Sequence, residues 1–210
     1  MLNAIKQLQW RYATKKFDSS KKLSAHELET ILEAANLAPT SMGLQPFKLF
    51  VVERDDVRHQ LRQAAWDQPQ VTDASHVIVF AVRRELTAAD ADAYLEHVSE
   101  VRGVGKDALA DYRNMLVGGI ESKTVADRRS WAARQAYISL GVVLTVCAIE
   151  SIDACPMEGF DTGAFDKILG LEEKGWASVV MVTVGTRHPD DKYQHLPKVR
   201  KALKDFVSIV

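Results

Sequence analysis

Two groups of basic side chains, near opposite ends of the chain, have the residue types and spacing to bind an anion. Arg11, Lys15 and Lys16 lie within six residues of one another, and Lys198 and Arg200 form a second group near the end. Arg and Lys gathered from distant parts of a chain commonly hold a phosphate. Basic residues are also ordinary surface residues, and cations at a helix end favour the helix dipole. The spacing therefore predicts a phosphate site only if the fold brings both groups together.

Composition excludes several classes of protein. The chain has 210 residues with 47% hydrophobic content, which predicts one compact domain over 1–210. A net charge of −1 does not favour a nucleic-acid or membrane-surface partner. Two cysteines, Cys147 and Cys155, are too few for a disulfide framework, and neither a signal peptide nor a run of about 20 apolar residues is present. We therefore expect a cytoplasmic protein.

Other motifs do not support competing chemistry. Gly103-Val104-Gly105-Lys106 lacks the preceding strand, the following Ser or Thr and the glycine spacing of a phosphate loop. No dinucleotide fingerprint opens a helix, the six histidines have no ligand spacing, and no serine stands in a nucleophile elbow. Cys155 has no paired thiol or adjacent base, which favours a buried structural role over a nucleophile. We expect no metal site.

The elements that must position the basic groups can be read from hydrophobic periodicity. Apolar residues predict buried or half-buried strands at 47–52, 76–82 and 176–184, and a strand and turn over 153–160. Helices are expected before Arg11, where Leu2, Ile5 and Leu8 recur, and over the following ranges: 25–37, 55–64, 122–149 and 164–169, with weak helical patterns over 87–117. The class is α+β with a central sheet, and about 87–120 is a helical excursion from it.

Local signals mark the ends of these elements. Ser24 and Glu27 form a capping box, Asp55 or Asp56 is expected to cap the next helix, and Gly170 to end a short one. The second half of the long helix, 136–149, is apolar all round, so it is buried in the domain or against a partner subunit.

Five motifs stand in one order along the chain. They are Arg-x-x-Thr-Lys-x-Phe-Asp from Arg11, Ala-Pro-Thr-Ser-x-x-x-Gln-Pro from Ala38, Asp-Ala-Ser-His-Val from Asp73, Pro-x-Glu-Gly-Phe-Asp from Pro156 and Leu-Pro-Lys-x-Arg from Leu196. Together they resemble the nitroreductase family of FMN enzymes, and are most similar to the oxygen-insensitive NAD(P)H nitroreductases and dihydropteridine reductases. The resemblance spans nearly the whole chain and is thinnest over 87–130.

The resemblance implies a fold and a set of cofactor contacts. The fold would be a nitroreductase-like intertwined homodimer, with a mostly antiparallel sheet surrounded by helices and FMN at the subunit interface. The implied contacts are Arg11, Lys198 and Arg200 to the phosphate; Tyr12, Ala13, Thr14 and Lys15 along the flavin; Thr40 and Ser41 to the partner's flavin; Asp67 and Gln70 to the ring; and the backbone of Glu158 and Gly159 facing flavin N5. No side chain is implied as an acid or base, and Lys15 and Glu158 are the nearest candidates to tune the ring.

Three positions depart from the family pattern. Ala13 replaces a serine, which removes one hydroxyl from the phosphate site. Asp67 replaces an asparagine, so we expect this carboxylate to turn away and to leave the contact to Gln68 or Gln70. Gln70 replaces a lysine, which removes a positive charge from the nicotinamide side. The last two changes bear on the flavin potential and on the choice between NADH and NADPH.

The resemblance predicts an FMN oxidoreductase that uses NAD(P)H as co-substrate. Two electrons would pass by a ping-pong mechanism to a nitroaromatic, a quinone or a pterin, because the flavin carries the chemistry. An enone, an aldehyde or a halogenated aromatic is an alternative acceptor. A redox-inert flavin-binding protein and a structural dimer without cofactor are alternatives from other classes.

Overall fold

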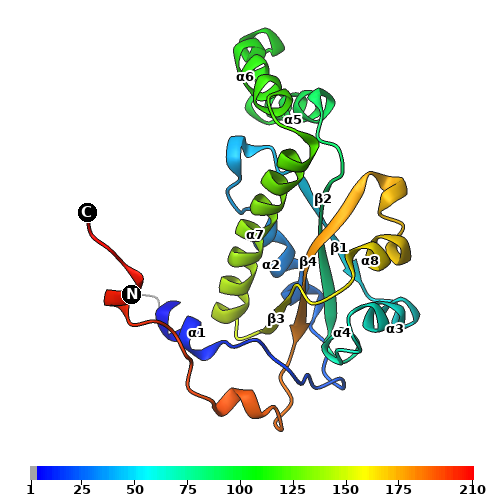
Figure 1. The fold of residues 1–210 in the computed structure, drawn as a ribbon, viewed down its shortest axis with the longest axis vertical. Helices are drawn as coiled ribbons and strands as arrows, with labels where there is room; N and C mark the ends of the chain where they lie inside the picture. The colour runs from blue at the N-terminus through cyan, green and yellow to red at the C-terminus, as the bar shows by residue number, and fades with distance from the viewer. Residues whose placement is uncertain (1–3) are drawn as a thin grey trace.

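A four-stranded antiparallel sheet forms the centre of the molecule in the computed structural model, which describes residues 4–210 (Figure 1). Its strands are β1 (Phe47–Val52), β2 (His76–Arg83), β3 (Asp153–Met157) and β4 (Trp176–Gly185), in the order β1-β2-β4-β3. All four predicted strands are confirmed. Because β3 is an edge strand, one side of it is open to another segment of the chain.

Helices cover both faces of the sheet, which explains the near-continuous apolar run in β2. Ile78, Phe80 and Val82 pack toward α2 (Ala25–Asn36) and α7 (Val125–Ile149). Val77 and Val79 pack toward the opposite layer, made of α3 (Asp55–Ala64), α4 (Gln70–Asp73) and α8 (Thr162–Leu169). A strand buried on both faces loses the alternation of a half-exposed one.

Helix α7 runs through the middle of the molecule and packs against α1 (Ala4–Trp10), α2 and β2. Its length and composition would suffice to cross a membrane, but Ala136, Leu140 and Val143 are buried in the core beneath the sheet. It is therefore a core helix. Other apolar residues on α7 stay exposed, among them Tyr137 and Ile138.

The helix ends follow local chemistry, with one correction. The Ser24–Glu27 capping box is present, and Gly170 ends α8 in the left-handed conformation with φ 59°. The predicted Asp55 or Asp56 cap is wrong: Arg54 is the N-cap residue of α3, and both aspartates lie in the first turn. There they still favour the positive end of the helix dipole.

A second body of helices projects from one end of the sheet. It consists of α5 (Ala88–Arg102), the 3-10 turn η2 (Lys106–Leu109) and α6 (Ala110–Glu121), as the upper part of Figure 1 shows. Gly103 ends α5 with φ 65°, which is the structural role of the glycine in the rejected phosphate-loop motif. These helices have a hydrophobic cluster of their own, which includes Leu95, Leu116 and Ile120.

The remaining segments are short. They are the 3-10 turns η1 (Ser41–Gly43), η3 (Glu172–Lys174) and η4 (Lys192–His195), and the helical turn α9 (Leu203–Phe206) in an exposed tail. The tail runs beside α1, so the two ends of the described chain lie on one side of the molecule (Figure 1). The predicted contribution of Leu2 to the first helix lies outside the described residues.

Candidate cofactor-binding site

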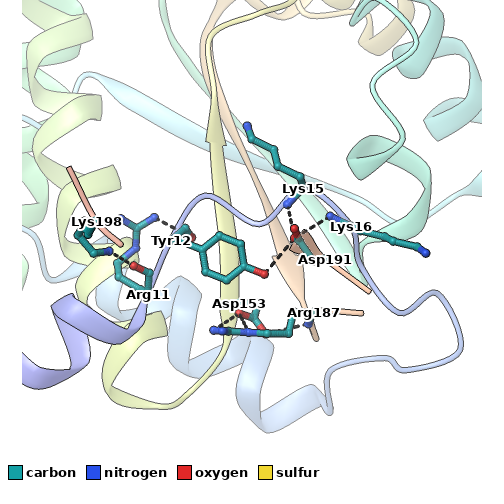
Figure 2. Close-up of polar contacts among 8 residues, drawn as sticks. All are labelled: Arg11, Tyr12, Lys15, Lys16, Asp153, Arg187, Asp191 and Lys198. Carbon is teal, nitrogen blue, oxygen red and sulfur yellow. Dashed lines mark hydrogen bonds and ion pairs between the residues drawn. The ribbon is translucent and has the colours of Figure 1, made fainter. Parts of the chain in front are cut away.

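The fold brings the two basic groups together. The ammonium of Lys198 donates to the backbone carbonyl of Arg11, which follows α1 (Figure 2). Arg11, Lys198 and Arg200 all line one hollow of about 540 Å³, and its walls are formed by residues 9–13, Lys15, Pro156, residues 193–194 and residues 196–200. The two basic groups therefore meet in the fold, as the predicted phosphate site requires.

The charges in this hollow repel one another. Burial, together with the positive charges of Arg11 and Arg200, lowers the pKa of Lys198. Burial is also the main cause that lowers the pKa of Arg11, and Arg200 adds to it. Cations that converge in a concave site favour a bound anion, since a phosphate would relieve their repulsion and accept their hydrogen bonds. The donor set therefore fits the terminal phosphate of a mononucleotide.

Asp191 holds the backbone that lines the hollow. Its Oδ2 accepts hydrogen bonds from the Lys15 N–H at 2.8 Å, the Lys16 N–H at 3.0 Å and the Tyr12 hydroxyl at 2.9 Å (Figure 2). Burial acts to raise the pKa of Asp191, but the N–H groups of Lys16, Lys15 and Tyr193 outweigh it and the pKa is lowered. Burial and this carboxylate also raise the pKa of Tyr12. Asp191 is thus an ionised clamp on the basic segment.

A second carboxylate fixes the aromatic rings beside the basic segment. Asp153, at the start of β3, pairs with Arg187: Arg187 Nε donates to Asp153 Oδ1 at 2.7 Å, and the Arg187 N–H to Oδ2 at 2.7 Å. The guanidinium lies 4.2 Å from the centre of the Trp10 ring and 4.7 Å from that of Tyr12. This cation–π contact with the Arg187 guanidinium helps to fix the orientation of the Tyr12 ring.

The basic segment also pairs with the open edge of β3. Ala13 forms a parallel bridge with Ala154, and the Thr14 N–H donates to the Ala154 carbonyl at 3.4 Å. Tyr12, Ala13 and Lys15 line the hollow, whereas the Thr14 side chain is fully buried and its hydroxyl has no partner among the described residues. Of Thr14, only the backbone remains a candidate cofactor contact.

Lys15 connects the hollow to the end of β3. Its side chain points away from Asp191 (Figure 2), and its Nζ lies 3.9 Å from the Cys155 thiol. Burial raises the pKa of Cys155, while Lys15 and Gln70 act in the opposite direction. Gln70 is itself buried at the start of α4. Cys155 is a buried free thiol, so its predicted burial is confirmed.

The turn after β3 carries Glu158 and Gly159, and each is held by a neighbour. The Tyr137 hydroxyl of α7 donates to the Glu158 carboxylate, and Gln68 Nε2 donates to the Gly159 carbonyl at 2.7 Å. A Cβ on Gly159 would lie 2.8 Å from the Trp66 ring. Asp67 is exposed, and the Gln68 contact is to protein backbone, so the expected transfer of a ring contact from Asp67 to Gln68 or Gln70 stays a prediction.

Thr40 and Ser41 lie elsewhere in the chain. They belong to the loop around η1, beside α5 and α6, whereas α1 and the basic tail lie near the opposite end of α7 (Figure 1). The Ser41 N–H donates to Gln135 of α7 at 2.8 Å. One copy of the chain therefore does not bring this pair to the hollow that holds Arg11 and Lys198.

Sequence reasoning did not identify Asp153, Arg187, Asp191 or Trp66. Three of them are charged residues in or beside loops, where charge is the ordinary state of a surface residue. Trp66 follows Ala65 in a left-handed turn, with φ 54° at Trp66 and φ 55° at Asp67. A large aromatic residue beside an acidic one in a helix break was the only signal available, and it is a weak one.

The match to a known family covers most of the chain. The model of the nitroreductase family matches residues 8–186, and the chain belongs to that family. The predicted family is confirmed, and with it the predicted α+β fold.

Relatives of similar length support the same assignment. YfkO of Bacillus subtilis, which carries the provisional name NAD(P)H nitroreductase, is 37% identical over 96% of this chain and 94% of its own. The major NAD(P)H-flavin oxidoreductase of Aliivibrio fischeri is 32% identical, over 98% of each chain.

Solved structures share the fold. The B. subtilis protein YdfN, provisionally named a nitroreductase, superposes with a TM-score of 0.87 at 25% identity, over 98% of both chains. A structure from Exiguobacterium sibiricum, solved in complex with FMN, has a TM-score of 0.84 at 19% identity, over 100% of this chain and 98% of its own. The enone reductase CLA-ER of gut-bacterial fatty acid metabolism has a TM-score of 0.83 at 20% identity, over 99% and 98%.

Proposed function

We propose that this protein is an FMN-dependent NAD(P)H oxidoreductase that passes two electrons to a small organic acceptor. Membership of the nitroreductase family supports the oxidoreductase class, and the names of its relatives support NAD(P)H and flavin. The observation that carries the proposal is the convergence of Arg11, Lys198 and Arg200 in one hollow. These cations suit the single terminal phosphate of FMN.

Each part of the site has a task in this proposal. Bound FMN supplies reversible two-electron chemistry between NAD(P)H and the acceptor. Arg11, Lys198 and Arg200 would bind its phosphate, and Asp191 keeps the backbone of Tyr12 to Lys16 in place along the hollow. Lys15 offers a positive charge along the ring, where it favours the reduced, more negative form. The turn at Glu158 and Gly159 would let backbone approach the flavin, because glycine has no side chain to hold it away.

The acceptor is a nitroaromatic, a quinone or a pterin in this proposal. The shared fold of CLA-ER keeps an enone as the second candidate, with an aldehyde or halogenated aromatic beside it. Parallel assays of one purified sample against these classes rank them by kcat/KM. A cytoplasmic location is part of the proposal, supported by two buried free thiols, and is checked by cell fractionation.

The cofactor proposal is tested on the purified protein. Acid should release FMN, NADH or NADPH should bleach the yellow colour without oxygen, and a Lys198→Ala/Arg200→Ala variant should bind FMN about 10² times more weakly because two charge-assisted contacts are lost. A colour that persists with both nucleotides would identify a redox-inert binder. A colourless protein that takes up no FMN would contradict the proposal.

A homodimer completes the proposed site. Tyr137 and Ile138 expose an apolar face on α7, and Phe206 and Ile209 of the tail are 75% and 97% exposed. Such surfaces are unfavourable in a monomer and resemble one half of a subunit interface. In an intertwined pair the tail packs on the second copy, and the Thr40–Ser41 loop of one copy reaches the flavin of the other. Within one chain this loop lies beside α5 and α6, whereas α1 and the tail lie near the opposite end of α7 (Figure 1), and this separation supports the arrangement.

A further inference from the structure

The loop that carries Thr40 and Ser41 has an unfavourable backbone. Met42 has φ 58° and Gln45 has φ 43°, and both are in the left-handed region that L side chains rarely adopt. Gly43, between them, has φ 70°. Three left-handed residues within four positions do not persist unless surrounding contacts hold them, and such conformations gather at functional sites.

Two tyrosines of the projecting helices hold this loop. The Tyr112 hydroxyl of α6 donates to the Met42 carbonyl at 2.7 Å. Tyr94 of α5 lies over Gly43, where an added Cβ would overlap the Tyr94 hydroxyl. The two rings meet edge to face, 6.4 Å apart at 70°. Both rings therefore act on consecutive residues, Met42 and Gly43, at the most strained part of the loop.

The hydrophobic residues of the loop pack against the projecting helices rather than against the sheet. Leu44 is buried in the hydrophobic cluster of α5 and α6, and Met42, Tyr94 and Tyr112 pack against that cluster. The body of the protein contributes polar contacts: the Ser41 N–H donates to the buried Gln135 of α7, and Gln45 Nε2 donates to the Asn36 carbonyl of α2 at 2.7 Å. The loop thus joins α7 on one side to α5 and α6 on the other.

We propose that Tyr112 and Tyr94 are positioning residues for flavin binding, through the loop that carries Thr40 and Ser41. The inference rests on the proposed function, because it needs this loop to contact the partner's FMN. The tyrosine contacts hold the loop in its strained form before the cofactor arrives, so the binding energy of FMN is not spent on ordering it. Displacement of α5 and α6 would consequently weaken FMN binding, although no residue of these helices lines the phosphate hollow.

The test compares three variants of the full-length protein. Tyr112→Phe removes the hydroxyl that binds Met42 and keeps the ring, while Gly43→Ala places a methyl group against Tyr94 from the loop side. Arg113→Gln is the matched control: it breaks the ion pair of Arg113 with Asp92, 2.5 Å long, which joins α6 to α5 without a contact to the loop. Hydrogen exchange of residues 40–46 is measured in each apoprotein, and the FMN dissociation constant by fluorescence.

We expect faster exchange of residues 40–46 in both loop variants, and an FMN dissociation constant raised about threefold to tenfold by Tyr112→Phe, the effect of one lost hydrogen bond. The control should leave both quantities near their wild-type values. Wild-type FMN affinity in Tyr112→Phe would overturn the inference and leave the proposed function intact. An equal loss in Arg113→Gln would also overturn it, since general loosening of the helices would then suffice. A wild-type protein that binds no FMN would overturn both.

Discussion

At the scale of single residues, the backbone N–H and the side-chain ammonium of Lys15 have different partners. Its backbone N–H is bound to Asp191, and its side chain points away from that carboxylate toward the end of β3 (Figure 2). The ammonium is therefore not neutralised by the clamp that holds its backbone. In the proposed site it is the cation available to the flavin ring.

Replacing Lys15 by Met removes that charge and keeps most of the aliphatic stem. Two unit charges about 4 Å apart interact by roughly 4 kcal/mol at an effective dielectric constant near 20, and exposure and delocalisation reduce this to about 1–3 kcal/mol. Lys15→Met should therefore lower the two-electron potential of bound FMN by roughly 20–60 mV, at about 30 mV for 1.4 kcal/mol. Potentiometric titration against a reference dye measures the shift. An unchanged potential in a fully loaded variant would show that Lys15 does not face the ring.

Gly159 is predicted to tolerate no side chain. In Gly159→Ala the new methyl group would lie 2.8 Å from the Trp66 ring and 3.3 Å from Gln68 Nε2, so the turn or the ring must shift. A displacement near the reacting edge should slow flavin reduction by NAD(P)H about tenfold, as seen in stopped-flow traces. Gly118→Ala on α6, where an added Cβ meets nothing within 4 Å, is the matched control and should reduce at the wild-type rate. Equal rates in all three proteins would remove Gly159 from the site.

At the scale of elements, the basic segment from Tyr12 to Lys16 depends on carboxylates from the other end of the chain. Asp191 caps the turn η4 and accepts three hydrogen bonds from this segment, while its neighbour Asp190 pairs with Lys16 and His188 at the surface. Two adjacent aspartates in one loop therefore contribute differently to holding the basic segment, and the sequence does not show which of them does so.

Asp191→Asn should loosen the basic segment, because an amide presents a donor where the carboxylate has only acceptors. We expect a loss of about 1–3 kcal/mol in the free energy of unfolding at neutral pH, together with weaker FMN binding. The pKa of Asp191 is lowered from its ordinary 3.8, so its stabilisation is present above that value and disappears as the pH falls through the lowered pKa. Denaturant unfolding at several pH values measures the difference. Asp190→Asn is the control, and an equal loss there would contradict the clamp.

Elements with a strong local signal could be predicted from the sequence, and long-range contacts could not. The apolar run in β2, the Ser24–Glu27 capping box and the stop at Gly170 each depend on neighbours in the chain. The predicted cap of α3 was wrong: the N-cap residue is Arg54, whose side chain makes no cap hydrogen bond. The four-residue helix α4 is too short to show a helical period of hydrophobic residues. Arg11 and Lys198 were suggested as one phosphate site by residue type, and the family motifs implied that they meet. Asp153 and Asp191 act across more than 30 and 170 residues, which no local pattern encodes.

At the scale of the whole molecule, the exposed apolar surface predicts assembly. Sedimentation at micromolar concentration should give about twice the chain mass of 23.4 kDa. Ile138→Glu places a charge on the exposed face of α7 and should shift the protein toward monomer with loss of FMN. Val101→Glu, at an equally apolar exposed position on α5, should leave the assembly unchanged. A wild-type monomer that is loaded with flavin and active would contradict the composite site.

The hollow of like charges formed by Arg11, Lys198 and Arg200 makes the composition of the buffer part of the behaviour of the apoprotein. Without cofactor, their mutual repulsion is relieved by any dianion that fits, so sulfate or inorganic phosphate should raise the melting temperature of the apoprotein more than chloride at equal ionic strength. The same anions should compete with FMN. The FMN content after purification will then depend on the salts used. A protein purified in phosphate buffer that has lost its yellow colour can still be an active enzyme once FMN is added back.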